Sequence, residues 1–227
     1  ELLPLEKLSW GNGLLELLTF IGIILGTVAG GLLAEHLAGR QHWSGLILAV
    51  LAFAGWRMST GITHVPPADP GCPPRLNPVT DLWTQLKLMK PDRDLWRSTW
   101  GNTGFWSVAT LVSMNMMIYA KEVLHLSDSE NGLLNAALAI GIGAGSAIAG
   151  FVSRGQIAYG LVPVGAAGIA LSTVPMGVDG IGTFKFSVSL VALGLAGGLF
   201  IVPIAAVLQH KPAPERKGAV QGAANLL

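Results

Sequence analysis

The chain has 227 residues and a net charge of +1, with 51% apolar residues, 12% charged residues and a mean hydropathy of +0.56. Soluble domains carry about a quarter charged residues, so this composition excludes an ordinary soluble fold and predicts a surface covered by lipid. The near-neutral charge gives no reason to expect a nucleic-acid partner, and the lone cysteine, Cys72, excludes an internal disulfide framework.

Six apolar segments follow one another along the chain, each close to the roughly 20 helical residues that cross a bilayer. They cover residues 12–35, 43–60, 101–120, 131–152, 158–178 and 186–208. Lipid offers no water to unpaired backbone groups, so each segment is predicted to be helical. The fold class is therefore an all-α membrane protein with six transmembrane helices. Residues 218–227 read as the start of a seventh helix and the chain has no initiator Met, so we expect a fragment.

The distribution of basic residues between the loops predicts the orientation, because cytoplasmic loops carry an excess of Lys and Arg. With the first residues in the cytoplasm, eleven of the 14 Lys and Arg residues lie on the cytoplasmic side, and only Arg40, Lys121 and Lys185 lie on the other. The opposite orientation would reverse this bias. We therefore expect a multi-pass membrane protein whose longest connection, 61–98, is cytoplasmic.

That connection divides the chain into three regions. Residues 1–60 hold two spans, residues 61–98 form the loop, and residues 99–227 hold four spans and the start of another. The loop is rich in Pro at first and then mixes Trp and Leu with basic residues over 81–97. This pattern fits an amphipathic helix in the headgroup region, or equally a solvated linker with a short helix.

An internal repeat links the two sides of this loop. Asn12-Gly-Leu-Leu15 recurs as Asn131-Gly-Leu-Leu134, at an offset of 119, with nine identities over positions 12–31. In the predicted orientation the two copies run in opposite directions across the membrane. Inverted repeats of this kind are the usual architecture of secondary transporters.

The glycines of the first span carry a family resemblance. Gly22, Gly26, Gly30 and Gly31 have the spacing of the motif Gly-x-x-x-Gly-Pro-x-x-Gly-Gly, which resembles the fifth helix of the major facilitator superfamily, with Thr27 in place of the Pro. The resemblance implies a major facilitator helical bundle, in which this chain would be helices five to ten and the start of the eleventh. Small residues let helices approach closely in membranes, so these glycines, with Gly141 and Gly145 in the second copy, are candidates for helix packing and gating.

Within that superfamily the chain is most similar to bacterial lysophospholipid transporters. The likeness rests on the runs 12–16, 26–34, 139–143, 197–203 and 206–209. It implies a protein of the bacterial inner membrane that transports lysophosphatidylethanolamine-type lipids by alternating access for re-acylation. It also implies an acyltransferase or acyl-carrier-protein synthetase as a fused or separate partner. Two alternatives stay open: a facilitator that exports another small molecule, such as a drug or a sugar, and a membrane anchor for a lipid acyltransferase.

Five side chains within the spans are candidates for binding substrate. Apart from Glu35, the last residue of the first predicted span, Glu16 is the only carboxylate inside a span. A buried charge is costly there, which makes Glu16 a functional candidate by default, and Asn12 lies on the same helical face. Asn115 and Tyr119 offer neutral hydrogen bonds to a headgroup, and Met116 is adaptable enough to suit an acyl chain. The alternative is structural: Glu16 snorkels to the membrane surface, and the third-span residues bond or pack against neighbouring helices.

No catalytic, cofactor or metal motif stands out. His64 and Asp69 fit the His-x-x-x-x-Asp pattern of glycerolipid acyltransferases, but the Pro-rich loop is too short to hold that domain. The other histidines have no partners at metal spacing, and phosphate-loop and nucleophile-elbow motifs are absent from the sequence. We therefore expect a transporter segment without enzymatic activity, bound metal or cofactor.

Overall fold

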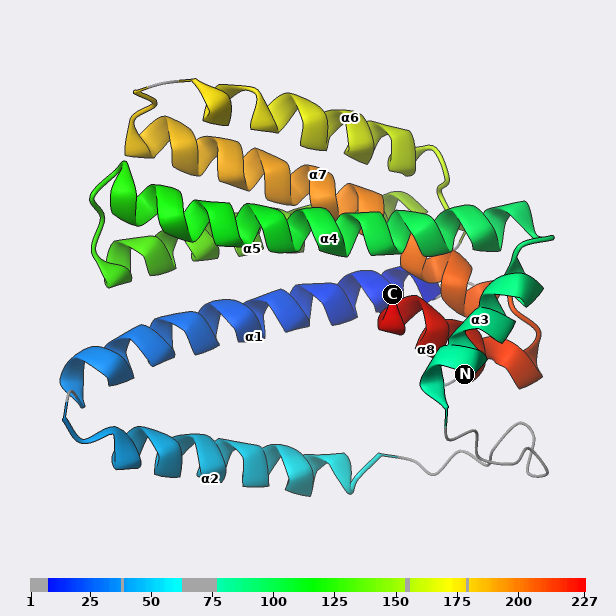
Figure 1. Ribbon diagram of the computed structural model, residues 1–227, viewed down its shortest axis with the longest axis horizontal. Coiled ribbons are helices and arrows are strands. Elements are labelled where there is room, and N and C mark those ends of the chain that lie inside the picture. Colours follow the sequence, from blue (N-terminus) through cyan, green and yellow to red (C-terminus); the bar gives the residue numbers. More distant parts are fainter. Residues whose placement is uncertain (1–7, 38, 63–76, 154–155, 179) are drawn as a thin grey trace.

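A computed structural model describes residues 8–37, 39–62, 77–153, 156–178 and 180–227. Within these ranges the regular structure is entirely helical, as predicted. The six long or apolar helices are α1 (Leu8–His36), α2 (Gln41–Ser59), α4 (Arg93–Glu122), α5 (Asp128–Ser153), α6 (Leu161–Thr173) and α7 (Thr183–His210). Two shorter helices, α3 (Pro78–Met89) and α8 (Lys217–Leu226), lie side by side at one end of the bundle (Figure 1).

Helix starts are set by local capping. Asn77 accepts hydrogen bonds from the backbone N–H groups of Val79 and Thr80 at the start of α3, at 3.1 and 3.3 Å. Asp92 does the same for Asp94 and Leu95 at the start of α4, at 3.0 and 3.2 Å. Such caps satisfy the backbone donors that a first turn leaves unpaired.

Helix α4 begins earlier than the predicted third span. Its 30 residues give a length of about 45 Å, whereas the hydrocarbon core of a bilayer is about 30 Å thick. The charged residues of 92–97 thus form the cap and first turns of α4 and do not belong to a separate amphipathic segment. Farther along α4, five hydroxyl groups donate to the carbonyl four residues earlier, which satisfies them without water: Thr99, Thr103, Ser107, Thr110 and Ser113.

Helix α6 is shorter than the predicted span 158–178. It ends at Thr173, and the 3-10 turn η2 (Pro175–Gly177) follows. Pro175 has no N–H to continue the α-helical bonding, which accounts for the change. By length and hydropathy alone, two helical stretches among the described residues suffice to cross a membrane, Ser129–Ser153 and Thr183–His210, and Leu17–Leu33 and Leu161–Gly177 are shorter apolar stretches.

The packing centres on α7. It lies against α5 on one side and α6 on another, with α4 in front of the α5–α7 pair and α1 beyond α5 (Figure 1). One buried cluster joins α3, α7 and α8, with Met89, Leu208 and Val220 at its centre. A second cluster, at the far end of the bundle, joins α4, α5 and α7 through Met116, Leu134 and Leu190.

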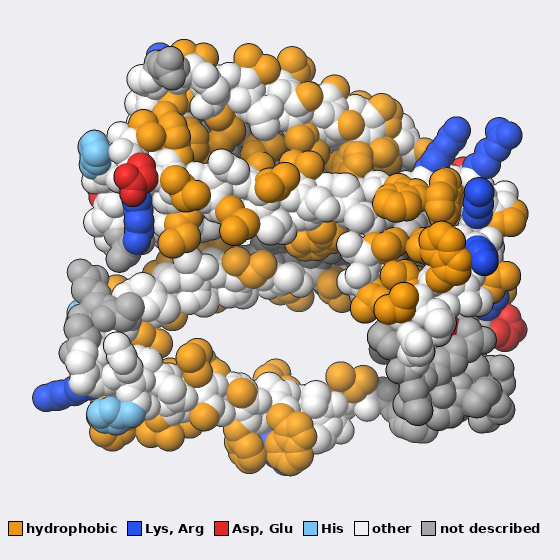
Figure 2. Space-filling view, viewed as in Figure 1, with side chains coloured by type: hydrophobic (Ala, Val, Ile, Leu, Met, Phe, Trp, Pro, Cys, Tyr) orange, Lys and Arg blue, Asp and Glu red, His pale blue; other side chains and the backbone are white. Residues whose placement is uncertain are grey.

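The outer faces of the helices are apolar. Hydrophobic side chains cover the bundle along its length, and Lys and Arg side chains gather toward its two ends (Figure 2). Helix α2 has no buried residue, yet its exposed side chains include Leu51, Phe53 and Trp56. Water would not support so large an apolar surface, whereas lipid or further helices would.

Candidate functional site

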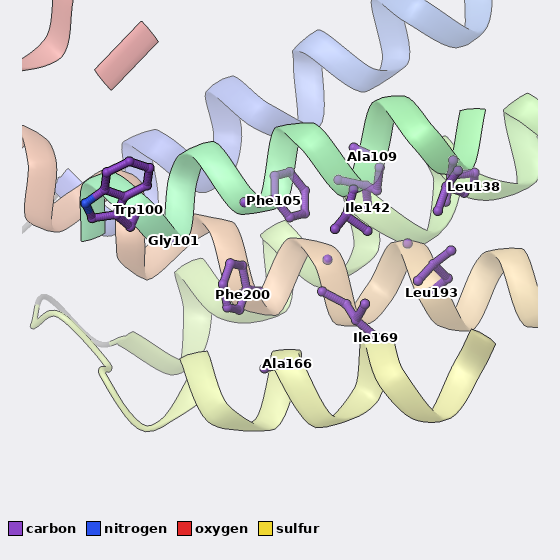
Figure 3. A pocket seen from close by; sticks show the side chains of 15 residues that line it. Trp100, Gly101, Phe105, Ala109, Leu138, Ile142, Ala166, Ile169, Leu193 and Phe200 are labelled. Carbon is purple, nitrogen blue, oxygen red and sulfur yellow. The ribbon is translucent and has the colours of Figure 1, made fainter. Parts of the chain in front are cut away.

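An apolar cavity lies between α4, α5, α6 and α7 (Figure 3). Its volume is about 280 Å³, and every lining residue is uncharged: Trp100, Gly101, Gly104, Phe105, Val108, Ala109, Val112, Leu138, Ile142, Ala166, Ile169, Leu193, Gly194, Gly197 and Phe200. Phe105 and Phe200 stack across it with ring centres 6.0 Å apart. Such walls favour an aliphatic or aromatic group and would leave a strongly polar ligand without hydrogen bonds.

A second cavity, of about 390 Å³, continues the first toward the end of α4. The two share Val108 and Val112 as lining residues. Three predicted site residues, Asn115, Met116 and Tyr119, line this second cavity together. The structure therefore places these three candidates around one mainly apolar cavity, next to the first one.

The three side chains have different environments. Asn115 is exposed and donates its side-chain N–H to the carbonyl of Leu111 at 2.9 Å. The Tyr119 ring stacks on Phe186, with centres 5.0 Å apart, whereas Met116 is 2% exposed and belongs to the buried cluster. Asn115 is the most accessible polar group of the three, and Met116 and Tyr119 form the wall behind it.

Asn12 and Glu16 lie in α1, but their side chains fall outside the described residues. The backbone still shows that they are far from Asn115. The turn of α1 that holds them packs near Ala147 and Phe151 of α5, whereas Met116 packs near Leu134. Thirteen residues of α5 separate Leu134 from Ala147, or about 20 Å along the helix. The five candidates thus lie in two groups along the bundle.

The predicted packing glycines also divide into two groups. A Cβ atom at Gly141 would overlap the carbonyl oxygen of Val191, and one at Gly145 would overlap that of Leu195, both on α7. Gly194 and Gly198 make the reciprocal approach from α7 to the backbone of α5. In contrast, a Cβ atom added at Gly22, Gly26, Gly30 or Gly31 of α1 would have no described atom within 4 Å.

An ion-pair cluster ties the beginning of α4 to the end of α7. The Lys211 ammonium lies 2.9 Å from the carboxylate of Asp92 and 2.5 Å from that of Asp94. The hydrogen bond from Lys211 lowers the pKa of Asp92, and the two carboxylates, Asp94 first, raise the pKa of Lys211. All three side chains are a third or more exposed, so the cluster is a weak clamp on the bundle end.

Several lining residues were not among the predicted candidates, notably Trp100, Phe105 and Phe200. The signal for Phe105 is present in the sequence: Gly101, Phe105, Val108 and Val112 recur at three- and four-residue spacing, which defines one face of a helix. Hydropathy alone does not separate that face from the lipid-facing one. Within the described part of the chain, no group of three His, Cys, Asp or Glu side chains is placed to hold a metal ion.

Apolar outer faces, charges toward the two ends and cavities between the helices define a helical membrane protein with several spans. The profile of the Major Facilitator Superfamily matches residues 1–227. The chain belongs to the major facilitator superfamily. This family assignment agrees with the glycine motif and with the antiparallel contact between the two copies of the internal repeat, in which Leu17 approaches Gly143 and Thr27 approaches Gly132.

Curated relatives within this superfamily are also similar to the chain. A lysophospholipid transporter of Klebsiella pneumoniae (strain 342) is 30% identical over 220 residues, which cover 93% of this chain and 52% of the relative. A lysophospholipid transporter of Enterobacter sp. (strain 638) is 29% identical over 223 residues, covering 93% and 52%. One from Yersinia pestis (strain Pestoides F) is 29% identical over 217 residues, covering 91% and 50%. The chain therefore spans about half the length of these relatives. No solved structure matches it.

Proposed function

We propose that the protein to which this chain belongs transports lysophospholipids, of the lysophosphatidylethanolamine type, across the bacterial inner membrane by alternating access. The observation that carries this proposal is the pair of adjacent, mainly apolar cavities along α4, with a polar group, Asn115, in the lining of one of them. A lysophospholipid has one acyl chain and one polar headgroup, so it matches this division. The curated relatives are lysophospholipid transporters, which supports the same substrate class.

The same features disfavour a sugar as the substrate. Sugar hydroxyl groups need hydrogen-bond partners, and a transfer into apolar surroundings without them costs about 2–7 kcal/mol per group. The cavity between α4 and α7 offers them no charged or hydroxyl side chain. An apolar drug would meet the same walls without that cost, so a drug exporter is the second candidate function.

The topology we propose follows the distribution of basic residues. Residues 1–60 would end the first helical half, residues 61–98 would lie in the cytoplasm, and residues 99–227 would begin the second half. The long loop would then connect two halves that rock against each other around the substrate. On the cytoplasmic side, an acyltransferase, fused or separate, would consume the delivered lysophospholipid by re-acylating it.

The test uses the full-length protein in proteoliposomes, with labelled lysophosphatidylethanolamine in one leaflet and a soluble apolar dye in parallel vesicles. We expect lysophospholipid to change leaflets faster than in protein-free vesicles, with little movement of the dye. Dye movement without lipid movement would support the exporter instead. A lipid rate equal to that of protein-free vesicles would contradict the proposal.

A further inference from the structure

A third cavity, of about 420 Å³, extends the apolar cavity toward the beginning of α4. The two cavities share Gly101 and Phe200 as lining residues, so they lie next to each other along α4. The third cavity differs in chemistry, because Asp94, Arg97 and Tyr159 line it together with apolar side chains. An apolar cavity next to a cation and a phenol matches an amphiphile with a phosphate headgroup.

The charge of Arg97 is available to a ligand. Asp94, one turn earlier on α4, is already bonded to Lys211. Within the ranges that the structure describes, no carboxylate is paired with Arg97, and its side chain is exposed. A guanidinium binds phosphate oxygens through two parallel N–H donors, and Tyr159, which lines the same cavity, has a hydroxyl group that can serve as a third donor.

Aromatic residues place Arg97 at the depth of lipid headgroups. Trp96 and Trp100 flank it on α4, with their rings edge to face and their centres 5.7 Å apart. Tryptophan is enriched at the interface between lipid and water, where its ring is apolar and its N–H is hydrated. The guanidinium thus lies near the level at which phosphates of that leaflet reside.

The dimensions fit one acyl chain within one leaflet. Eleven residues separate Arg97 from Val108, where the apolar cavity meets its neighbour, or about 16 Å along the helix. Half of a hydrocarbon core of about 30 Å is about 15 Å. An acyl chain whose headgroup lies at Arg97 would therefore end near Val108, at the middle of the membrane.

We infer that Arg97 and Tyr159 form a phosphate subsite for a single-chain phospholipid whose acyl chain occupies the apolar cavity between α4, α5, α6 and α7. In the orientation proposed above, this lipid belongs to the cytoplasmic leaflet. The inference rests on the proposed function and adds to it a place where the transported lipid is held on the cytoplasmic side.

The test uses photo-crosslinking of the full-length protein in phosphatidylcholine nanodiscs. The probes are lysophosphatidylethanolamine with a diazirine in its acyl chain, a monoacylglycerol with the same chain but no phosphate, and a diacyl phosphatidylethanolamine. We expect the lysophospholipid to label peptides of α4, α6 and α7. Arg97→Gln should reduce this labelling about tenfold, since a charge-assisted hydrogen bond is removed, and Arg97→Lys should retain more of it. Tyr159→Phe should reduce it less than Arg97→Gln does.

Arg93→Gln is the matched control, because it removes the same charge from the same helix and lines none of the three cavities. It should label as the wild type does, and the monoacylglycerol should label the wild type and Arg97→Gln equally. Undiminished labelling in Arg97→Gln would overturn the inference. Absence of label from these helices would also overturn it, because another segment would then fill the cavity. Equal labelling by the diacyl lipid would overturn it as well.

Leaflet exchange of lysophosphatidylethanolamine, measured on the same preparations, separates the two proposals. If the lipid exchanges between leaflets but the labelling does not depend on Arg97, the subsite is rejected and the transport function stands. Labelling that depends on Arg97 without any exchange rejects the transport function and supports the subsite as a binding site.

Discussion

Helices α1 and α5 carry the two copies of one sequence repeat, yet their glycines meet different surroundings. Gly145 lies where any side chain would overlap the backbone of α7, whereas Gly26, its counterpart at an offset of 119, has no described atom within 4 Å of an added Cβ. Gly141 and Gly22 differ in the same way. A glycine motif in a membrane helix therefore permits a close approach, but the partner helix decides whether that approach occurs.

The two contacts of α5 also differ in kind. Against α7 the approach is backbone to backbone, with Gly141 and Gly145 facing Gly194 and Gly198. Against α1 the approach is made by side chains such as Leu17 and Thr27. Interdigitated backbones have little freedom to slide, whereas side chains can repack. We therefore expect α5 and α7 to move as one body and α1 to move against them.

The largest effect is expected from replacing one glycine by alanine in each copy of the repeat, in α5 and in α1. Gly145→Ala should destabilise the folded protein by about 2–3 kcal/mol or abolish its expression, because the new Cβ overlaps the carbonyl of Leu195. Gly26→Ala, the matched control, should change stability by less than about 0.5 kcal/mol. Thermal unfolding of the two full-length variants in detergent gives the comparison. Equal losses would mean that the face of α1 is packed as tightly as that of α5.

A larger side chain at Gly104 tests the cavity without disturbing either contact. A Cβ atom there has nothing within 4 Å, so Leu should enter the apolar space and displace an acyl chain. We expect lysophospholipid exchange to fall by about tenfold, the effect of losing roughly 1.4 kcal/mol of binding, at unchanged stability. Gly55→Leu on α2 is the control, since its added Cβ is also unopposed and it lines none of the described cavities. If exchange were unaffected by Gly104→Leu, the cavity would not be the lipid path.

The two copies of the repeat also differ in charge at one position. Glu16 corresponds to Asn135 in the repeat, and the Asn135 side chain donates to the carbonyl of Asn131 at 3.1 Å within its own helix. Glu16→Gln should slow lysophospholipid exchange several-fold, up to about tenfold, if the carboxylate meets the headgroup ammonium. Asn135→Ala should leave exchange near the wild-type rate. Wild-type exchange in Glu16→Gln would assign that carboxylate to the membrane surface.

The smallest effect is expected at the ion-pair cluster, which is remote from both contacts. Lys211→Met should lower the stability of the full-length protein by less than about 1 kcal/mol at pH 7 and make it less sensitive to salt.

The pH dependence follows from the shifted groups. The pKa of Asp92 is lowered, so its contribution is lost as the pH falls below about 4 and through the lowered value. The pKa of Lys211 is raised, so its contribution is lost as the pH rises above about 10 and through the raised value. The stability difference between wild type and Lys211→Met should thus be constant near neutral pH and shrink on acidification. A constant difference down to pH 3 would exclude the clamp.

The sequence predicted the helical elements well, because apolar length is a direct consequence of the bilayer. The six predicted spans match α1, α2, α4, α5, α6 and α7, with the ends of α4 and α6 displaced. Helix α4 is longer because Asp92 caps it before its apolar part begins, and α6 is shorter because Pro175 interrupts it. These are local effects that hydropathy averages out.

The site was less predictable, since it depends on which helical faces meet. Asn115, Met116 and Tyr119 were identified by their chemistry and line one cavity, but Glu16 and Asn12 lie on a distant turn. Phe200 and Phe105 come from helices almost a hundred residues apart, and only their contact in space marks them as lining residues. The pairing of Gly145 with α7 and the open position of Gly26 likewise cannot be read from their identical spacing.

The most direct test of the account measures whether α5 and α7 form one body against which α1 moves. Spin labels would be placed on exposed residues of the full-length protein, at Leu25 of α1, Ile140 of α5 and Val188 of α7. Pairwise distances would be measured by electron spin resonance with and without lysophosphatidylethanolamine. We predict that the distance between positions 140 and 188 stays constant while that between 25 and 140 changes. A change between 140 and 188, or no change between 25 and 140, would contradict the account.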